Sequence, residues 1–233
     1  MSRSSAGISR LKTKIPRALI PSLLATALLA SCATTPPPPP PPPPAPSAPS
    51  GAVLSDWRGV ITAADRDRYQ RRAAAWTLAL QQAKRQPGSG DLAGLGDLIV
   101  PDAARPSVTP PVGNYRCRTV KLGSQGGEQG LGYVVYGWFA CRIEQTPAGL
   151  KFSKLTGSQR PSGLLFPEND RQMVFLGSMS LASEPAARSY GLRPDRDMVA
   201  VVERIGERRW RLVIPWPANE SNLDLIELVP AAR

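Results

Sequence analysis

The side chains that most often carry enzyme chemistry are scarce in this chain. No histidine occurs among its 233 residues, which excludes Ser-His-Asp and Cys-His catalytic arrangements and every metal site built on imidazole. Two acidic groupings remain, Glu168 with Asp170 and Asp195 with Asp197. Neither has the alternating oxygen ligands of a calcium loop. We therefore predict no catalytic residues, no metal site and no cofactor.

Cys117 and Cys141 are two of the three cysteines and are expected to form a disulfide. An even pair in an exported chain indicates an oxidising compartment. The closed ring contains about 24 residues, for which the bond contributes roughly 2–4 kcal/mol. Two thiols without histidine or a third cysteine make a poor zinc site.

Cys32, the remaining cysteine, follows a segment with the anatomy of a secretory signal. The first 17 residues contain five basic residues and no acid, and the apolar stretch Ala18–Ala30 comes next. This stretch is shorter than the ~20 residues of a transmembrane helix, although a transmembrane anchor remains the alternative. Leu29-Ala30-Ser31-Cys32 resembles the lipobox of bacterial lipoproteins.

This lipobox resemblance implies cleavage before Cys32 and acylation of its thiol. Two or more acyl chains give lasting membrane attachment, so we expect a lipid-anchored, periplasm-facing protein of the cell envelope. Ala33, rather than an aspartate, follows the cysteine and favours the outer membrane. The nine prolines Pro36–Pro44 predict a polyproline II spacer of roughly 28 Å; a ligand for a proline-binding module is the alternative.

The charge balance argues against nucleic acid as a partner. The net charge of the whole chain is +11, from 29 basic and 18 acidic residues. Removal of the five basic residues before Cys32 leaves 24 basic against 18 acidic residues, a net charge of +6. This moderate excess favours solubility and some attraction to anionic lipid or envelope polymers. The two densest basic groups, Arg66–Arg72 and Arg204–Arg211, are predicted to be solvated faces.

A helical segment should open the folded part. Thr62 and Asp65 resemble a capping box, and residues up to about Lys84 lack glycine and proline. Within this predicted helix, one apolar stripe has helical spacing: Tyr69, Ala73, Trp76 and Leu80. A second short helix is predicted over Asp91–Val100, followed by a proline-rich loop to Pro111.

From Val112 onward, short β-branched and aromatic runs alternate with turn residues, which predicts eight strands. Their expected bounds are Val112–Leu122, Leu131–Gln145, Gly149–Leu155, Gly163–Phe166, Arg171–Ser180, Met198–Ile205, Arg208–Ile214 and Leu223–Val229. If Cys117 opposes Cys141, the numbers of paired residues sum to 258 and the hairpin centres on residue 129, within the glycine-rich Gly123–Gly132. The interior face then carries Tyr115, Cys117, Thr119, Leu131, Tyr133, Val135, Phe139, Cys141 and Ile143, with Trp210, Leu212 and Ile214 on a later strand.

Eight sequential antiparallel strands leave two exposed edges unless the sheet closes. We therefore predict a mainly β fold with an N-terminal helix: an eight-stranded up-and-down barrel of the lipocalin or avidin kind. A two-sheet β-sandwich is the alternative. The expected organisation is a signal peptide over 1–31, a lipidated cysteine and spacer over 32–51, a helical segment and loop over 52–110, and the barrel over 111–233.

Several motifs of this region resemble one uncharacterised lipoprotein domain family of Gram-negative bacteria, which is catalogued only as a domain of unknown function. They are Gly113–Arg118, Trp138–Ile143, Lys154–Arg160, Phe175–Gly177 and Trp210–Leu212. The resemblance extends from about Trp57 to Val229. It implies an envelope location and a paired-cysteine core, and it supplies no catalytic residues.

A binding or interaction role is the function that these features favour. An interior cavity lined by Tyr115, Tyr133, Phe139 and Trp210 would admit a small apolar or amphipathic ligand, whereas a filled core would not. Arg160 could hold a ligand carboxylate or bridge two loops. The alternatives are an accessory subunit of an outer-membrane assembly, with an envelope protein as partner, and a histidine-free cell-wall hydrolase that uses Glu168 or Asp170. The sequence leaves the oligomeric state open.

Overall fold

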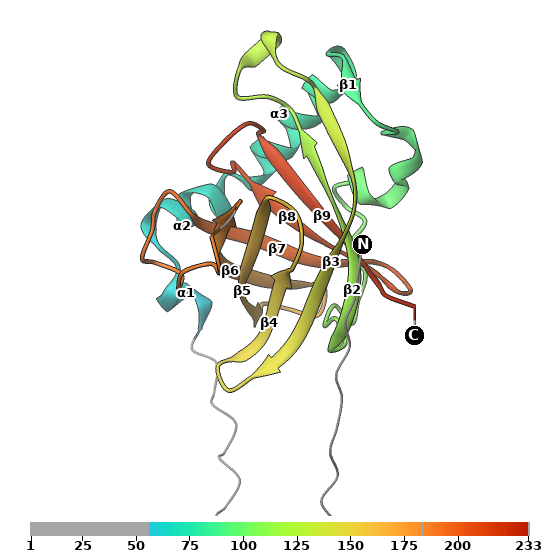
Figure 1. The fold of residues 1–233 in the computed structure, drawn as a ribbon. Helices are drawn as coiled ribbons and strands as arrows, with labels where there is room; N and C mark the ends of the chain where they lie inside the picture. Colours follow the sequence, from blue (N-terminus) through green and yellow to red (C-terminus); the bar gives the residue numbers. More distant parts are fainter. Residues whose placement is uncertain (1–55, 183, 233) are drawn as a thin grey trace, which may run out of the picture. The chain divides into compact units, whose positions relative to one another are not determined.

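The computed structural model describes residues 56–182 and 184–232. The signal segment, Cys32 and the proline run lie outside the described residues. The elements in chain order are α1 (Trp57–Val60), α2 (Ala63–Gln70), α3 (Arg72–Arg85), β1 (Gly88–Ser89), η1 (Ala93–Ile99), β2 (Gly113–Leu122), η2 (Gly127–Gln129), β3 (Tyr133–Thr146), β4 (Gly149–Lys154), β5 (Gln159–Pro167), β6 (Gln172–Leu181), β7 (Asp197–Gly206), β8 (Arg209–Pro215) and β9 (Leu223–Pro230) (Figure 1).

Strands β2 to β9 form a closed antiparallel barrel. Each pairs with its neighbours along the chain, and β2 also pairs with β9. Every one of the eight predicted strands coincides with one of these, so the predicted up-and-down barrel is confirmed and the sandwich is excluded. Closure pairs both edges of the sheet. The two-residue β1, which was not predicted, adds a parallel strand to β3.

The disulfide joins Cys117 on β2 to Cys141 on β3, with a Cα–Cα distance of 5.9 Å. The predicted register is nevertheless wrong by two residues. Cys117 pairs with Phe139, and Tyr115 pairs with Cys141, so the disulfide runs diagonally across the ladder. A shift of two keeps each side chain on its predicted face, because strand side chains alternate with a period of two.

A bulge in β3 changes which residues face the interior. Arg118 pairs with Trp138 but Val120 pairs with Val135, so β3 has one more residue than β2 over this interval. An extra residue reverses the alternation on the far side of a bulge. Tyr133 and Val135 therefore pack on the outer face of the barrel, against the cluster that contains α3. Their predicted place in the interior, and that of the 46% exposed Leu131, is wrong.

Side chains fill the barrel. One cluster contains both cysteines, Tyr115, Trp210 and a central pair of phenylalanines, Phe152 and Phe175, whose ring centroids are 5.9 Å apart. A Cβ atom on Gly177 would lie 2.3 Å from the Phe175 ring and 2.9 Å from the Cα of Gly163. Glycines therefore make the room that the aromatic rings occupy, as small and large residues do in narrow barrels.

The helices pack against the outside of the barrel (Figure 1). Thr62 caps α2 by accepting from the backbone of Asp65, as predicted. The single predicted helix is divided at Arg71, which alters the buried face: Trp76 is buried but Ala73 is exposed. The predicted stripe is therefore wrong at Ala73. The buried residues of α3 pack on β2, β7, β8 and β9, and α1 packs on β5, β6 and β7.

The second predicted helix is a 3-10 segment, η1, divided at Gly96. Two of its carbonyls accept hydrogen bonds from the guanidinium of Arg211. The side chain of Arg211 is fully buried on the outer face of β8. The prediction that Arg204–Arg211 forms a solvated face is therefore wrong at Arg211. Among the residues that the structure describes, no helix is both long enough and apolar enough to cross a membrane.

Candidate functional site

One mouth of the barrel is formed by the connections β2–β3, β4–β5, β6–β7 and β8–β9. At this end the wall is split. The ladder between β7 and β8 stops at Val201 and Val213, although β7 continues to pair with β6 as far as Asp197. The first residues of β7 and the last residues of β8 therefore separate at the rim.

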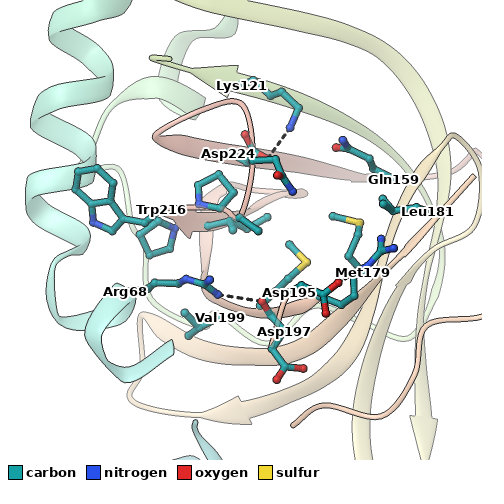
Figure 2. Close-up of a pocket in the computed structure, with 17 residues that line it drawn as sticks. Arg68, Lys121, Gln159, Met179, Leu181, Asp195, Asp197, Val199, Trp216 and Asp224 are labelled. Atoms are coloured by element: carbon teal, nitrogen blue, oxygen red, sulfur yellow. Dashed lines mark hydrogen bonds and ion pairs between the residues drawn. The ribbon is translucent and has the colours of Figure 1, made fainter. Parts of the chain in front are cut away.

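A cavity of about 300 Å³ occupies this split. Met179, Met198 and Ile214 supply apolar surface, and all three belong to or pack on the interior cluster. Figure 2 shows the Lys121–Asp224 pair along one edge, Trp216 and Arg68 on one side, and Gln159, Met179 and Leu181 on the other. The cavity is thus an extension of the barrel interior that opens to solvent.

Lys121 and Asp224 form a buried ion pair in the wall of this cavity. They are directly paired across β2 and β9, and Lys121 Nζ donates to Asp224 Oδ2 at 3.0 Å. Burial lowers the pKa of Lys121, but the Asp224 charge and hydrogen bond outweigh it, so the net pKa is raised. Burial raises the pKa of Asp224, against the opposing effects of Lys121 and the Ser221 hydroxyl. Glu220 adds a second carboxylate 3.1 Å from Lys121 Nζ.

Lys154, at the end of β4, is a second buried amine at this mouth. Its Nζ donates to the carbonyls of Thr156 and Gln159 at 2.8 and 2.9 Å and lies 3.8 Å from the centroid of the Phe139 ring. Burial, followed by the charges of Arg160 and Lys121, lowers its pKa to about 8. Its donors are used to close the β4–β5 loop, so we assign Lys154 a structural role.

A polar cluster secures α2 to the outer rim of the same mouth. Asp65, fully buried, accepts from Arg68 Nη1 at 2.8 Å and from the Tyr190 hydroxyl at 2.7 Å. Asp197 Oδ1 accepts from the backbone of Gly191 at 3.0 Å, whereas its buried Oδ2 has no hydrogen-bond partner among the described residues. Burial raises the pKa of Asp197, and the nearby charge of Asp65 adds to the effect.

Backbone strain is concentrated around this mouth. Four described non-glycine residues have positive φ, and three of them, Ala182, Trp216 and Glu220, lie in the loops at this end. Such conformations cost on the order of 1–3 kcal/mol each and cluster at ligand sites and switch regions. The Trp216 side chain is secured by its Nε1 hydrogen bond to the Arg71 carbonyl at 3.1 Å.

The predicted ligand residues do not form one cavity. Tyr133 packs outside the barrel, and Phe139 covers Lys154. Tyr115 and Trp210 lie at the opposite end of the barrel, where they pack edge to face and line a hollow of about 580 Å³. Their polar atoms are used internally, since the Tyr115 hydroxyl donates to Pro111 and Trp210 Nε1 donates to Val108.

Arg160 connects two loops at the mouth. Its guanidinium donates to the carbonyls of Gly157, Ala182 and Glu184. This is the loop-bridging arrangement that was one of its two predicted roles. Its contact with a ligand carboxylate stays a prediction.

The two predicted acidic groupings are used within the protein. Glu168 accepts from Trp57 Nε1 and from Arg58, both at 2.7 Å, and so holds α1 on the barrel. Asp170 accepts from the backbone of Ser107. Asp195 forms an ion pair with Arg193 at 2.8 Å. The described residues bring no group of three or more histidine, cysteine or acidic side chains together as metal ligands.

The residues that shape the cavity were missed at the sequence level. Lys121, Gln159, Met179 and Asp224 come from four different strands and are far apart along the chain. One signal was present: Lys121 and Asp224 are charged residues at positions that the strand alternation places inside. The cavity offers apolar surface, the Lys121–Asp224 ion pair, and the side-chain amides of Gln159 and Asn219, which make no hydrogen bond to other described residues. This combination suits reversible binding better than bond-breaking chemistry.

Comparison with known proteins adds a family but no activity. Residues 57–228 match the family described as "Domain of unknown function (DUF4893)". This confirms the coarser part of the predicted resemblance, a domain of unknown function over nearly all the folded part. No curated protein and no solved structure matches the chain.

Proposed function

The chain belongs to the DUF4893 family, and we propose that it is a non-catalytic binding protein of the cell envelope that holds a small amphipathic ligand at the split mouth of its barrel. The observation that carries this proposal is the cavity of about 300 Å³ where the β7–β8 ladder ends. This volume lies at the small end of the range for ligand pockets. The remaining interior is filled by side chains.

The lining defines the chemistry of the ligand. Met179, Met198 and Ile214 would contact an apolar part, and methionine adapts well to varied shapes. The side-chain amides of Gln159 and Asn219 also line the cavity and make no hydrogen bond to other described residues. They can therefore donate to and accept from hydroxyl or amide groups. Since Lys121 and Asp224 neutralise each other, a neutral head group fits better than a charged one.

Anchoring by Cys32 is the second part of the proposal. It is supported by the lipobox resemblance and by the basic and apolar segments that precede it. We predict that metabolic labelling with palmitate marks the full chain and that Cys32→Ser abolishes the label. An unmarked chain whose membrane fractionation is unchanged by Cys32→Ser would exclude the anchor and leave the pocket proposal untouched.

Ligand binding is tested by thermal unfolding of the full chain with short-chain monoacylglycerols, N-acyl amides and a muropeptide. A ligand at 100 times its Kd should stabilise the protein by about 2.7 kcal/mol. Ala218, an exposed residue of the cavity rim, offers a variant with little risk to folding. We expect Ala218→Trp to fill the opening and remove the shift in Tm.

Ala74→Trp provides the matched control, because Ala74 is exposed on α3 and away from the cavity. It should keep the full ligand-induced shift. Equal shifts in both variants would place any binding elsewhere. No shift with any probe, together with one stoichiometric protein recovered by crosslinking, would replace the proposal with that of an accessory subunit.

A further inference from the structure

The outer wall formed by β2 and β3 carries an exposed basic and aromatic surface that none of the described helices covers. We define this surface, the Trp138 face, by Arg116, Arg118, Trp138 and Arg142. Trp138 is 41% exposed, and Tyr136, two residues earlier, is 40% exposed. Tryptophan normally buries most of its surface area in a folded protein. The exposure of Trp138 therefore indicates an interaction surface.

The ladder places these side chains together. Arg118 pairs directly with Trp138, Arg116 pairs with Ala140, and Asn114 pairs with Arg142. Arg116 and Arg142 are therefore diagonal neighbours on one face. The guanidinium carbons of Arg116 and Arg118 lie 4.7 and 4.9 Å from the centre of the Trp138 ring. Cation–π contact of this kind holds the guanidinium groups around the indole.

The positive charge of this face is only partly neutralised. Arg118 is paired with Glu227, which Arg209 also contacts. Within residues 56–182 and 184–232, no carboxylate forms an ion pair with Arg116 or Arg142. The surface therefore presents the guanidinium group of Arg116 beside the indole, and that of Arg142 farther along the same face. Guanidinium groups match phosphate oxygens, and tryptophan favours the boundary between lipid head groups and acyl chains.

We propose that the Trp138 face docks on an anionic phospholipid bilayer, with the arginines on lipid phosphates and Trp138 at the head-group level. This goes beyond the proposed ligand binding and does not depend on it. In a closed eight-stranded barrel β3 lies across from β7. Docking through β2 and β3 therefore leaves the cavity at the β7–β8 split away from the bilayer and open to solvent.

The chain between Cys32 and the first described residue is long enough to permit this orientation. Residues 33–55 separate the two, and an extended chain covers at most about 3.3–3.6 Å per residue. A tether of this length does not dictate which face meets the bilayer. The charge and the aromatic residue on the Trp138 face would make that selection.

The test is oxidative footprinting of the full chain with vesicles, read out by mass spectrometry at single residues. In vesicles of phosphatidylcholine alone, Trp138 and Tyr136 should oxidise readily. With a quarter phosphatidylglycerol, we expect their oxidation to fall several-fold, and 1 M salt should restore it because the Debye length is then about 3 Å. Unchanged oxidation of the buried Trp210 would report an intact fold.

Charge variants decide whether this face is responsible. Arg116→Ala with Arg142→Ala should weaken the partition by about five-fold for each arginine and restore oxidation of Trp138 in anionic vesicles. Lys84→Ala with Arg85→Ala removes the same charge from exposed positions on α3 and should change nothing. Anionic lipid that leaves Trp138 unprotected would overturn the proposal, as would equal effects of the two double variants. Protection only in native envelopes would also overturn it, since that outcome indicates a protein partner.

Discussion

Arg211 illustrates how one charged side chain can organise a whole segment of backbone. Its side chain is fully buried, and its Nε donates to Glu203 Oε2 at 2.7 Å. The remaining donors reach the carbonyls of Asp97, Leu98, Val100 and Pro101 at 2.7–3.1 Å. Burial lowers the pKa of Arg211, with Glu203 acting in the opposite direction. These contacts connect the end of η1 and the turn that follows it to Arg211 on β8.

We predict that Arg211→Met destabilises the protein by about 3–5 kcal/mol, because Glu203 is left as an unpaired buried charge. Urea denaturation of the wild type and variant measures this difference. Arg211→Lys should recover little, since lysine lacks the planar fork that serves several carbonyls at once.

Replacing both partners separates the cost of the orphaned charge from the value of the pair. Arg211→Met with Glu203→Met should be more stable than Arg211→Met alone, because no buried charge is left without a partner. If the double variant is the less stable of the two, Glu203 is not the source of the loss.

At the scale of elements, the β2–β3 hairpin combines a covalent link with a change of face. The disulfide lies on the interior side near Tyr115 and Phe139, whereas the bulge beyond it turns Tyr133 and Val135 outward beneath α3. One strand thus contributes to two hydrophobic clusters. The bulge is what allows β3 to line the barrel at one end and to bind the helix layer at the other.

We predict that Cys117→Ser with Cys141→Ser lowers the free energy of unfolding by about 2–4 kcal/mol, the range expected for a loop of 24 residues. Urea denaturation, with and without reductant, measures the change. Reductant should destabilise the wild type by a similar amount and leave the double variant unaffected. An equal effect of reductant on both proteins would show that the disulfide is not its target.

At the scale of the whole molecule, the helices and the barrel are joined through a buried polar cluster at the rim. The groups that face Asp197 are Asp65 and Arg68 from α2, the Gly191 backbone of the β6–β7 connection, and Asp195 beside it. Burial and the two aspartates raise the pKa of Asp197, and Arg68 and the hydrogen bond from Gly191 oppose them. Ionised Asp197 therefore costs stability in the folded state.

The sign of the resulting pH dependence follows from this raised pKa. A carboxyl group with a raised pKa in the folded state stabilises the protein while it is protonated. The protein loses this stabilisation as the pH rises through the folded-state pKa. We predict that Asp197→Asn raises Tm at pH 7, by roughly 2–4 °C for about 1 kcal/mol. The advantage should shrink as the pH falls toward the usual carboxyl range, where Asp197 is protonated. A gain that is constant across this range would contradict the assignment.

The sequence predicted the fold more completely than the site. Eight alternating runs located all eight strands, and the need to pair their edges predicted closure. The pairing of Cys117 with Cys141 followed from their being the two cysteines that remain once Cys32 is assigned to lipidation. The position of Tyr133 outside the barrel and the burial of Arg211 could not be predicted, because a bulge reversed the face of Tyr133 and the η1 segment covers Arg211.

Local alternation and composition are properties of adjacent residues, so the sequence by itself determined the strand positions, the barrel class and the pairing of the cysteines. The cavity, the rim cluster and the Trp138 face depend on which distant strands meet and in what register. Lys121 and Asp224 become partners only when β2 closes against β9. Only the tertiary structure could decide these features, because the free energy of a buried charge is set by neighbours that the chain brings together on folding.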